Sequence, residues 1–144
     1  RGGVDVFNPN AIRASTGAVF ELPVVVCGEE EAVERLTGAE GRRAKDEGRS
    51  GWRVIAAMVD GAVDYREVAR GLRDGGGDER GVAVVIGPED RGLGARWAEV
   101  AEATGGAAVR VPMAAGGVVD SLNASVAAGV LVYGLGLGVG RSEV

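Results

Sequence analysis

The regular alternation of short apolar runs and helical segments is the feature that most constrains how this chain can fold. The most apolar run, residues 81–87 (GVAVVIG), is continuous and ends in Gly-Pro, which is typical of a strand buried on both faces. Runs at 22–27, 53–59 and 107–111 predict further strands, and the stretches at 29–36, 64–72, 93–104 and from 121 onward predict helices. This alternation predicts an α/β fold with a mainly parallel sheet flanked by helices.

The loop that leaves the most apolar run, residues 87–94, contains residues suited to holding a ligand. In sheets of this kind, ligands bind beyond the carboxyl ends of the strands. Gly87 and Gly92 would allow the backbone to approach a ligand closely, and Glu89 between them could orient or deprotonate it. On the residues alone, a simpler alternative stays open, in which Glu89 only occupies the first turn of the next helix.

A second loop, residues 112–123, combines glycines with a polar helix start. Gly116 and Gly117 precede Ser121, the predicted N-cap, and Asn123 adds an amide in the first turn. Backbone N–H groups and the helix dipole favour partial negative charge at such a place. Capping alone would also explain these polar residues, so both interpretations stay open. The helix that follows is apolar on nearly every side, as expected in a core or between subunits.

Composition excludes several classes of site. The 144 residues are 46% apolar and 26% charged, which suits one folded domain with a core. The chain has no histidine and a single cysteine, Cys27, so intramolecular disulfides, Cys/His zinc sites and Ser-His-Asp triads are excluded. We expect Cys27 to be a buried, inert thiol in a cytoplasmic protein that holds no metal.

Charge and hydropathy bear on the partners. The formal net charge of −5 argues against a broad basic surface for nucleic acid, although local arginine clusters can still bind it. The apolar run at residues 127–139 is too short to span a bilayer, so no membrane attachment is expected.

Three stretches, in this order, resemble the SpoU/TrmH family of RNA 2′-O-ribose methyltransferases, of the SPOUT (α/β-knot) superfamily. They are NPNAIRASTGAVFELPV (8–24), VVIGPEDRGL (84–93) and VRVPMAAGGVVDSLNASVAAGVLVY (109–133). The second resembles the family's G-P-E-x-x-G-L motif. The third resembles its P-M-x-G-x-V-x-S-L-N-x-S-x-A motif, with one extra residue in the loop. The likeness covers residues 5–133.

The resemblance implies a single SpoU-type methyltransferase domain over residues 1–144, with a C-terminal trefoil knot. Members of the family bind S-adenosylmethionine in a bent form within the knotted loops. They methylate ribosomal or transfer RNA and work as homodimers with the last helix at the interface. The resemblance therefore implies S-adenosylmethionine as cofactor, RNA as substrate, and a second copy of the chain as partner for the apolar segment at residues 126–132.

The resemblance also implies roles for individual residues. Those expected to shape the catalytic pocket are Glu89, Ser121 and Asn123. Those expected to contact the cofactor are Ala57, Gly87, Gly92, Val111, Met113 and Leu122. Arg13 and Arg91 are candidates for RNA phosphate contacts. Because the chain has no histidine and arginine stays protonated, Glu89 is the only carboxylate of these motifs placed as a base or orienting group.

One departure from the family pattern concerns an earlier N-x-G-x-x-x-R motif, whose arginine has the central catalytic role. The segment from Asn8 to Arg13 looks similar, but the residues after it match the family's next stretch, so that role is not transferred to Arg13. We therefore expect the chain to begin after the first motif. The alternative to an active methyltransferase is a non-catalytic, cofactor-binding, dimerising remnant. A nucleotide-binding oxidoreductase domain is a third hypothesis, and it does not explain residues 121–123.

Overall fold

A computed structural model gives the structure of the protein and describes residues 5–38, 51–60, 62–74, 80–114 and 121–136. The chain divides into two compact units, Arg1–Ala32 and Val33–Val144. Gly116 and Gly117 of the predicted loop at 112–123 lie outside the described residues. Among the described residues, no helix is both long and apolar enough to cross a membrane.

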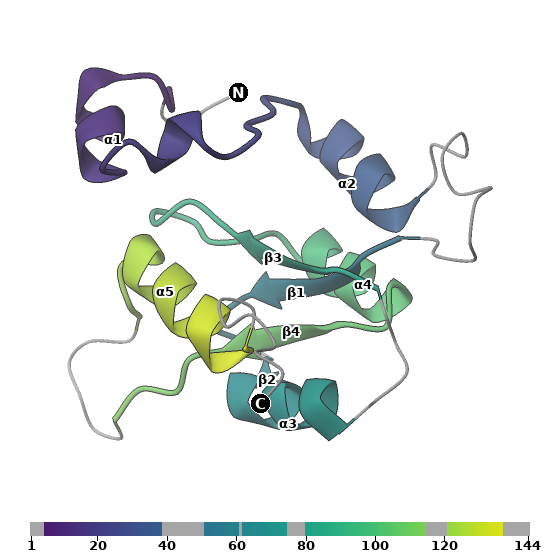
Figure 1. The fold of residues 1–144 in the computed structure, drawn as a ribbon. Coiled ribbons are helices and arrows are strands. Elements are labelled where there is room, and N and C mark those ends of the chain that lie inside the picture. Colours follow the sequence, from purple (N-terminus) through teal and green to yellow (C-terminus); the bar gives the residue numbers. More distant parts are fainter. Residues whose placement is uncertain (1–4, 39–50, 61, 75–79, 115–120, 137–144) are drawn as a thin grey trace, which may run out of the picture. The chain divides into compact units, whose positions relative to one another are not determined.

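The second unit is built on a four-stranded parallel sheet with the strand order β2-β4-β1-β3 (Figure 1). The inner strand β1 (Arg53–Ala57) pairs with β3 (Val82–Ile86) on one side and with β4 (Ala107–Arg110) on the other. The short strand β2 (Val63–Asp64) pairs with β4 at the edge. The sheet confirms the predicted α/β class and three of the predicted strands.

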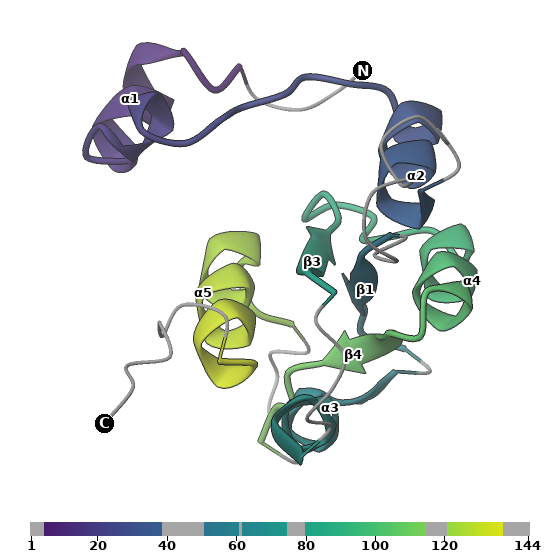
Figure 2. The same ribbon diagram turned by 45° about the vertical axis from the view of Figure 1, so that its right-hand side comes forward.

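Helices cover both faces of this sheet (Figure 2). Helix α4 (Arg96–Ala103) packs on one face, against β1 and β4, and buries Trp97, Val100 and Ala101. Helices α3 (Tyr65–Asp74) and α5 (Ala124–Gly134) cover the other face. Because side chains on both faces of a strand are then buried, the strands have the continuous apolar sequences from which they were predicted.

The hydrophobic core beneath α3 and α5 combines residues from four elements. Its buried members are Ile55 of β1, Val109 of β4, Ala69 of α3, and Leu131 and Leu135 at the end of α5. Each is at most 3% exposed. This core fixes α5 against the sheet, and thereby fixes where the N-terminus of α5 lies relative to the ends of the strands.

The first unit contains a short helix, α1 (Pro9–Ala14), followed by a turn of 3₁₀ helix, η1 (Ala18–Phe20). The Asn8 side chain caps α1 by accepting a hydrogen bond from the Asn10 N–H at 2.9 Å, and Pro9 occupies the first helical position. Helix α2 (Glu29–Thr37), with three glutamates in its first turn, crosses from the first unit into the second.

The prediction of a strand at residues 22–27 is wrong. The structure has no strand there, and the side chains are exposed, with Leu22 at 65% and Val26 at 86%. Valine-rich sequence favours a strand only when a neighbouring strand supplies hydrogen-bond partners, and none of the described strands pairs with this segment. For the same reason Cys27, expected to be buried, is exposed. The C-terminal trefoil knot is not shown within the described residues.

Candidate active site

A cavity of about 750 Å³ lies where the carboxyl ends of β1, β3 and β4 meet the first turns of α5. This volume is in the range of small-molecule sites, about 300–1,000 Å³. The residues that line it are Ala57, Met58, Val59, Asp60, Ile86, Gly87, Pro88, Glu89, Arg91, Gly92, Leu93, Val109, Arg110, Val111, Pro112, Met113, Ser121, Leu122, Ala124, Ala127 and Leu131. The cavity is therefore at the edge of the sheet where ligands bind in parallel α/β folds.

Most of the site residues expected from the sequence line this one cavity. They are Ala57, Gly87, Glu89, Arg91, Gly92, Val111, Met113, Ser121 and Leu122. Asn123 contacts the cavity through its hydrogen bond to Glu89. Arg13 lies on α1 in the first unit, and its role in RNA binding stays a prediction. The structure thus brings together residues that lie up to 65 positions apart, as counted from Ala57 and Leu122 in the sequence.

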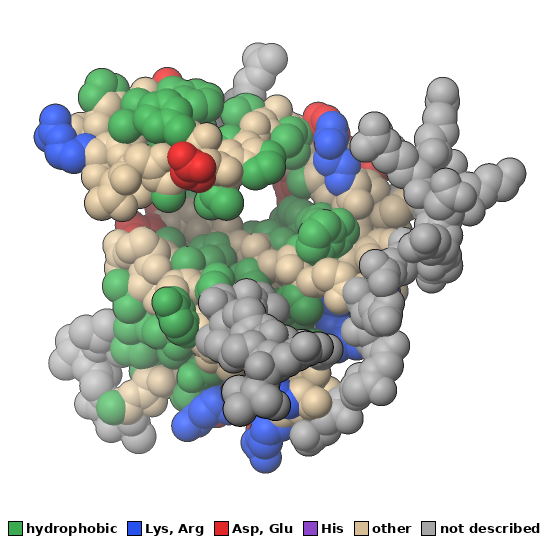
Figure 3. All heavy atoms as spheres, viewed as in Figure 1, with side chains coloured by type: hydrophobic (Ala, Val, Ile, Leu, Met, Phe, Trp, Pro, Cys, Tyr) green, Lys and Arg blue, Asp and Glu red, His purple; other side chains and the backbone are tan. Residues whose placement is uncertain are grey.

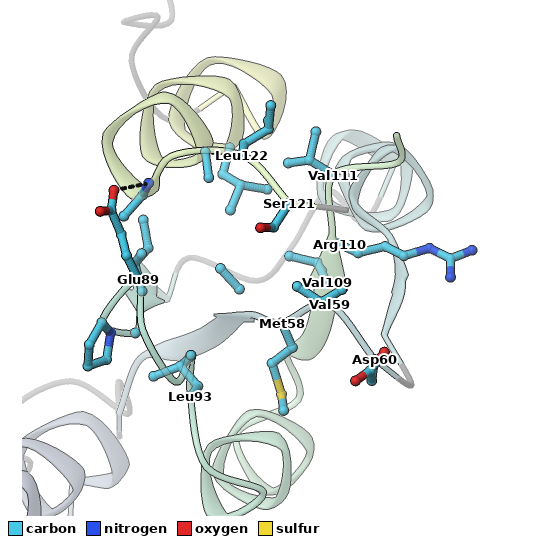
Figure 4. A pocket seen from close by; sticks show the side chains of 18 of the residues that line it. Met58, Val59, Asp60, Glu89, Leu93, Val109, Arg110, Val111, Ser121 and Leu122 are labelled. Carbon is cyan, nitrogen blue, oxygen red and sulfur yellow. Dashed lines mark hydrogen bonds between the residues drawn. The ribbon is translucent and has the colours of Figure 1, made fainter. Parts of the chain in front are cut away.

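The sequence analysis missed two charged lining residues, Asp60 and Arg110. Asp60 follows β1 and Arg110 ends β4, so both lie at carboxyl ends of strands. That position was the available signal: Asp60 lies outside the three stretches, and Arg110 lies in the third stretch but before its motif pattern, which begins at Pro112. In Figure 4, Glu89 lies on one side of the cavity, and Asp60 and Arg110 lie on the opposite side, with the Arg110 side chain extending outward.

The loop between β3 and α4 folds tightly over Gly87. A Cβ atom on Gly87 would lie 2.3 Å from the backbone carbon of Gly92 and 2.5 Å from the nitrogen of Leu93. The Gly92 N–H donates to the carbonyl of Pro88 at 2.8 Å, and Gly92 has φ of 63°, which favours glycine. Both glycines are therefore required to close the loop, whether or not they also allow a ligand to approach.

Glu89 joins this loop to the start of α5. Its Oε1 accepts hydrogen bonds from the Asn123 side-chain Nδ2 at 2.5 Å and from the Ala124 N–H at 3.1 Å, the contact at the start of α5 seen in Figure 4. A carboxylate is stabilised there because the N–H groups of the first helical turn have no partner within the helix. Glu89 does not occupy the first turn of α4, because that helix begins only at Arg96.

Asn123, and not the predicted Ser121, is the N-cap of α5. The Asn123 Oδ1 accepts from the Ser125 N–H at 3.0 Å and from the Ser125 hydroxyl at 2.6 Å. The reason is positional: α5 begins at Ala124, so the residue just before it is the one that can reach the second helical N–H. The Ser121 side chain is thereby left out of the cap, and in Figure 4 it lies at the cavity.

The wall of the cavity combines apolar and polar surface in similar amounts. Ile86, Val109, Val111 and Leu122 supply carbon surface, and Glu89 supplies a carboxylate with one oxygen already bonded to α5. Among the described residues, no donor is hydrogen-bonded to Oε2 of Glu89, so that oxygen can accept a hydrogen bond from a ligand. At the rim, Arg91 pairs with Asp90 at 3.4 Å, an exposed contact that contributes little to stability.

No group of His, Cys, Asp and Glu side chains among the described residues could hold a metal ion. The polar chemistry of the cavity wall therefore comes from the Glu89 carboxylate, the Ser121 hydroxyl, the charged side chains at the rim and backbone groups. Such a wall can bind a small, partly apolar molecule and orient a hydroxyl group next to it.

Comparisons with known proteins relate the chain to RNA methylases. The model of the family described as "SpoU rRNA Methylase family" matches residues 1–133. An "Uncharacterized tRNA/rRNA methyltransferase" of Archaeoglobus fulgidus is 34% identical over 125 residues, which cover 87% of this chain and 45% of that protein.

Two solved structures share the fold. An AdoMet-bound rRNA methyltransferase from Sinorhizobium meliloti matches with a TM-score of 0.70 at 26% identity, covering 98% of this chain and 45% of that one. An RNA 2′-O ribose methyltransferase matches with a TM-score of 0.68 at 33% identity, covering 93% and 42%. The chain spans less than half the length of these relatives.

Proposed function

The chain belongs to the SpoU rRNA methylase family, and from this we propose that it acts in S-adenosylmethionine-dependent methylation of a ribose 2′-hydroxyl in RNA. The observation that carries the proposal is the hydrogen bond between Glu89 and Asn123, which joins two motifs 34 residues apart at one cavity. The 33% identity to an RNA 2′-O ribose methyltransferase supports the ribose oxygen as the methylated atom.

The cavity suits a cofactor that is part apolar and part polar. We propose that the backbone contacts to S-adenosylmethionine are made at Ala57, Gly87, Val111 and Leu122, and that Gly92 and Met113 complete the wall. Gly87 has no side chain and lines the cavity, and an adenine edge can be bound by main-chain N–H and C=O groups. Support for this cofactor comes from the AdoMet-bound relative of Sinorhizobium meliloti, which shares the fold.

Glu89 and Ser121 are proposed to act on the substrate. When bound, the cofactor supplies a methyl group that its sulfonium has already activated. The chain therefore mainly has to position the ribose hydroxyl and assist loss of its proton. We propose that Oε2 of Glu89 accepts a hydrogen bond from that hydroxyl, while Oε1 accepts the hydrogen bond from the Asn123 side chain. Arg13 and Arg91 remain the proposed contacts to RNA phosphates.

A homodimer through α5 is part of the proposal. Val126 and Tyr133 on this helix are 50% and 73% exposed, which is high for apolar side chains on so apolar a helix. We propose that a second copy of the chain covers them, that the family's knot forms around this segment, and that the protein is cytoplasmic. Sedimentation of the wild type and of Val126→Glu tests the dimer: the variant should sediment as a monomer, and an unchanged dimer would contradict the α5 interface.

The alternative function is a cofactor-binding, dimerising remnant without turnover. It is kept because residues 1–144 contain no N-x-G-x-x-x-R motif and cover less than half of the relatives. Titration calorimetry with S-adenosylmethionine, combined with methyl transfer to total RNA, separates the two. Binding with transfer supports the methyltransferase, and binding without transfer supports the remnant.

The role of Glu89 is tested by Glu89→Gln with Asp90→Asn as the matched control. Both variants remove one carboxylate charge from the same exposed loop, but Asp90 pairs with Arg91 at the rim and is not hydrogen-bonded to α5 within the described residues. We expect Glu89→Gln to reduce methyl transfer by about 10²–10⁴-fold, typical of a lost acid–base group, and Asp90→Asn to retain it. Equal activity of the two variants would remove Glu89 from the proposed site.

A further inference from the structure

Three arginines of α3 share one face of the helix. Arg66, Arg70 and Arg73 follow one another at spacings of four and three residues, and residues so spaced are neighbours on a helix surface. All three are exposed. Figure 3 shows blue Lys and Arg side chains gathered over α3, at the bottom of the view. With a rise of about 1.5 Å per residue, the row extends over about 10 Å.

Each of the three arginine side chains uses part of its guanidinium group in a hydrogen bond within the protein. Arg66 binds the Asp64 carboxylate, with Nε–Oδ1 at 2.9 Å and Nη2–Oδ2 at 2.5 Å. The Arg70 Nε donates to the carbonyl of Arg66 at 3.2 Å, and the Arg73 Nη2 donates to the carbonyl of Gly134 at 3.3 Å. Because only part of each guanidinium is used, N–H groups remain exposed along the helix for an external acceptor.

Arg110 connects this row to the cavity. Strand β2 pairs with β4 so that Asp64 lies opposite Arg110, which places Arg110 beside the start of the row. Arg110 also lines the cavity and is exposed, and its side chain extends outward in Figure 4. Hydrogen bonds from Arg66, helped by the positive charges of Arg66 and Arg110, hold the pKa of Asp64 at about 2. The basic side chains thus continue from the cavity rim along α3.

We propose that Arg66, Arg70, Arg73 and Arg110, here called the arginine row, bind the phosphate backbone of the substrate RNA. This inference rests on the proposed RNA methylation and adds where the RNA lies. The row has four arginines, and the acidic residues of β2 and α3 are Asp64, Glu67 and Asp74, so positive charge is in excess here in a chain whose net charge is −5.

The length of the row favours a polyanion over a single small anion. A small anion is bound by convergent donors, whereas these arginines are spread along about 10 Å of helix. Arginine is well suited to phosphate because its planar group donates two parallel hydrogen bonds. A backbone bound along α3 would pass Arg110 and reach the rim of the cavity, where the proposed ribose oxygen must enter.

The test measures RNA affinity against salt for the full chain. The probe is fluorescein-labelled polyuridylate, and its dissociation constant is measured from about 50 to 200 mM KCl. Each phosphate contact to a single strand contributes about 0.7 to the slope of log K against log salt. The double variant Arg70→Gln/Arg73→Gln should therefore lower the slope by about 1.4, so that the affinity lost over this fourfold salt range shrinks about sevenfold.

Two further variants make the result specific. Arg96→Gln, an exposed arginine at the start of α4 on the other face of the sheet, is the matched control and should keep the wild-type slope. Arg70→Lys/Arg73→Lys keeps both charges and should also keep most of the slope. Calorimetry with S-adenosylmethionine should give the same affinity for all variants, which shows that the cavity and the fold are intact.

The outcomes separate the arginine row from the proposed function. A wild-type slope in the Gln double variant, or an equal decrease in Arg96→Gln, would overturn the arginine row while leaving methyl transfer untouched. Failure of the wild type to bind polyuridylate would also overturn the row. Failure of the wild type to bind S-adenosylmethionine or to methylate RNA would instead count against the proposed function.

Discussion

Replacing Asn123 by Asp separates its two roles, capping α5 and binding Glu89. Asp and Asn are about equally good N-caps, so the contact to the Ser125 N–H is kept. The Asn123 Nδ2 donor to Glu89 is lost, and two carboxylates then replace the hydrogen-bonded pair, whose donor–acceptor distance is 2.5 Å. A hydrogen bond to a charged group contributes about 1.5–3 kcal/mol, and we take the low end because the contact is exposed.

Repulsion between the two carboxylates adds to this loss. At about 4 Å in water it amounts to about 1 kcal/mol, so Asn123→Asp should destabilise the protein by about 2.5 kcal/mol at pH 7. With a urea m-value of about 2 kcal/mol/M, the midpoint of unfolding should fall by about 1 M. The assay is urea denaturation followed by circular dichroism.

The control is the same substitution in a Glu89→Gln background. There the amide introduced at position 89 can donate to the new carboxylate, so Asn123→Asp should cost little, and the double-mutant cycle should give a coupling energy of about 2.5 kcal/mol. An equal loss in both backgrounds would show that Glu89 and Asn123 do not interact. The two motifs would then not be joined as the structure indicates.

Two other substitutions give measurable outcomes. Gly87→Ala places a Cβ 2.3 Å from the Gly92 backbone and should lower the free energy of unfolding, measured in urea, by about 1–3 kcal/mol. Gly94→Ala is the control, because its Cβ meets nothing within 4 Å, and it should keep the wild-type stability. Equal stability of the two variants would refute the packing argument. The hydrogen bonds from Arg66 hold the pKa of Asp64 at about 2. In Arg66→Gln, an NMR titration should therefore find the pKa of Asp64 raised toward its ordinary value of about 3.9. Because the folded pKa is depressed, the ion pair stabilises the fold above about pH 4 and this contribution is lost as pH falls through about 2, a loss that Arg66→Gln should not show.

The sheet could be predicted because burial on both faces leaves a simple sequence pattern. Residues 53–57 and 82–86 are largely apolar, and each became a strand. The valine-rich segment at 22–27 has the same local preference but did not become one, since a strand also needs a partner. Two-residue β2 could not be predicted, because it is defined only by its pairing with β4.

The candidate site was predictable where it lies in motifs and not where it depends on packing. The motif residues Gly87, Glu89 and Leu122 do line one cavity. The N-cap was predicted at Ser121 and lies at Asn123, because the sequence does not state at which residue α5 begins. The spacing of the arginines on α3 is readable in the sequence, but the place of Arg110 beside them follows from the register of β2 and β4.

The central claim, methylation of a ribose 2′-oxygen, is tested most directly by locating the transferred methyl group. The chain is incubated with total RNA and S-adenosylmethionine carrying a tritiated methyl group, and the RNA is then hydrolysed in alkali. A 2′-O-methyl group blocks cleavage of the adjacent phosphodiester, so the account predicts tritium in alkali-resistant dinucleotides. Tritium in mononucleotides with a methylated base, or no tritium in RNA from a chain that binds the cofactor, would contradict it.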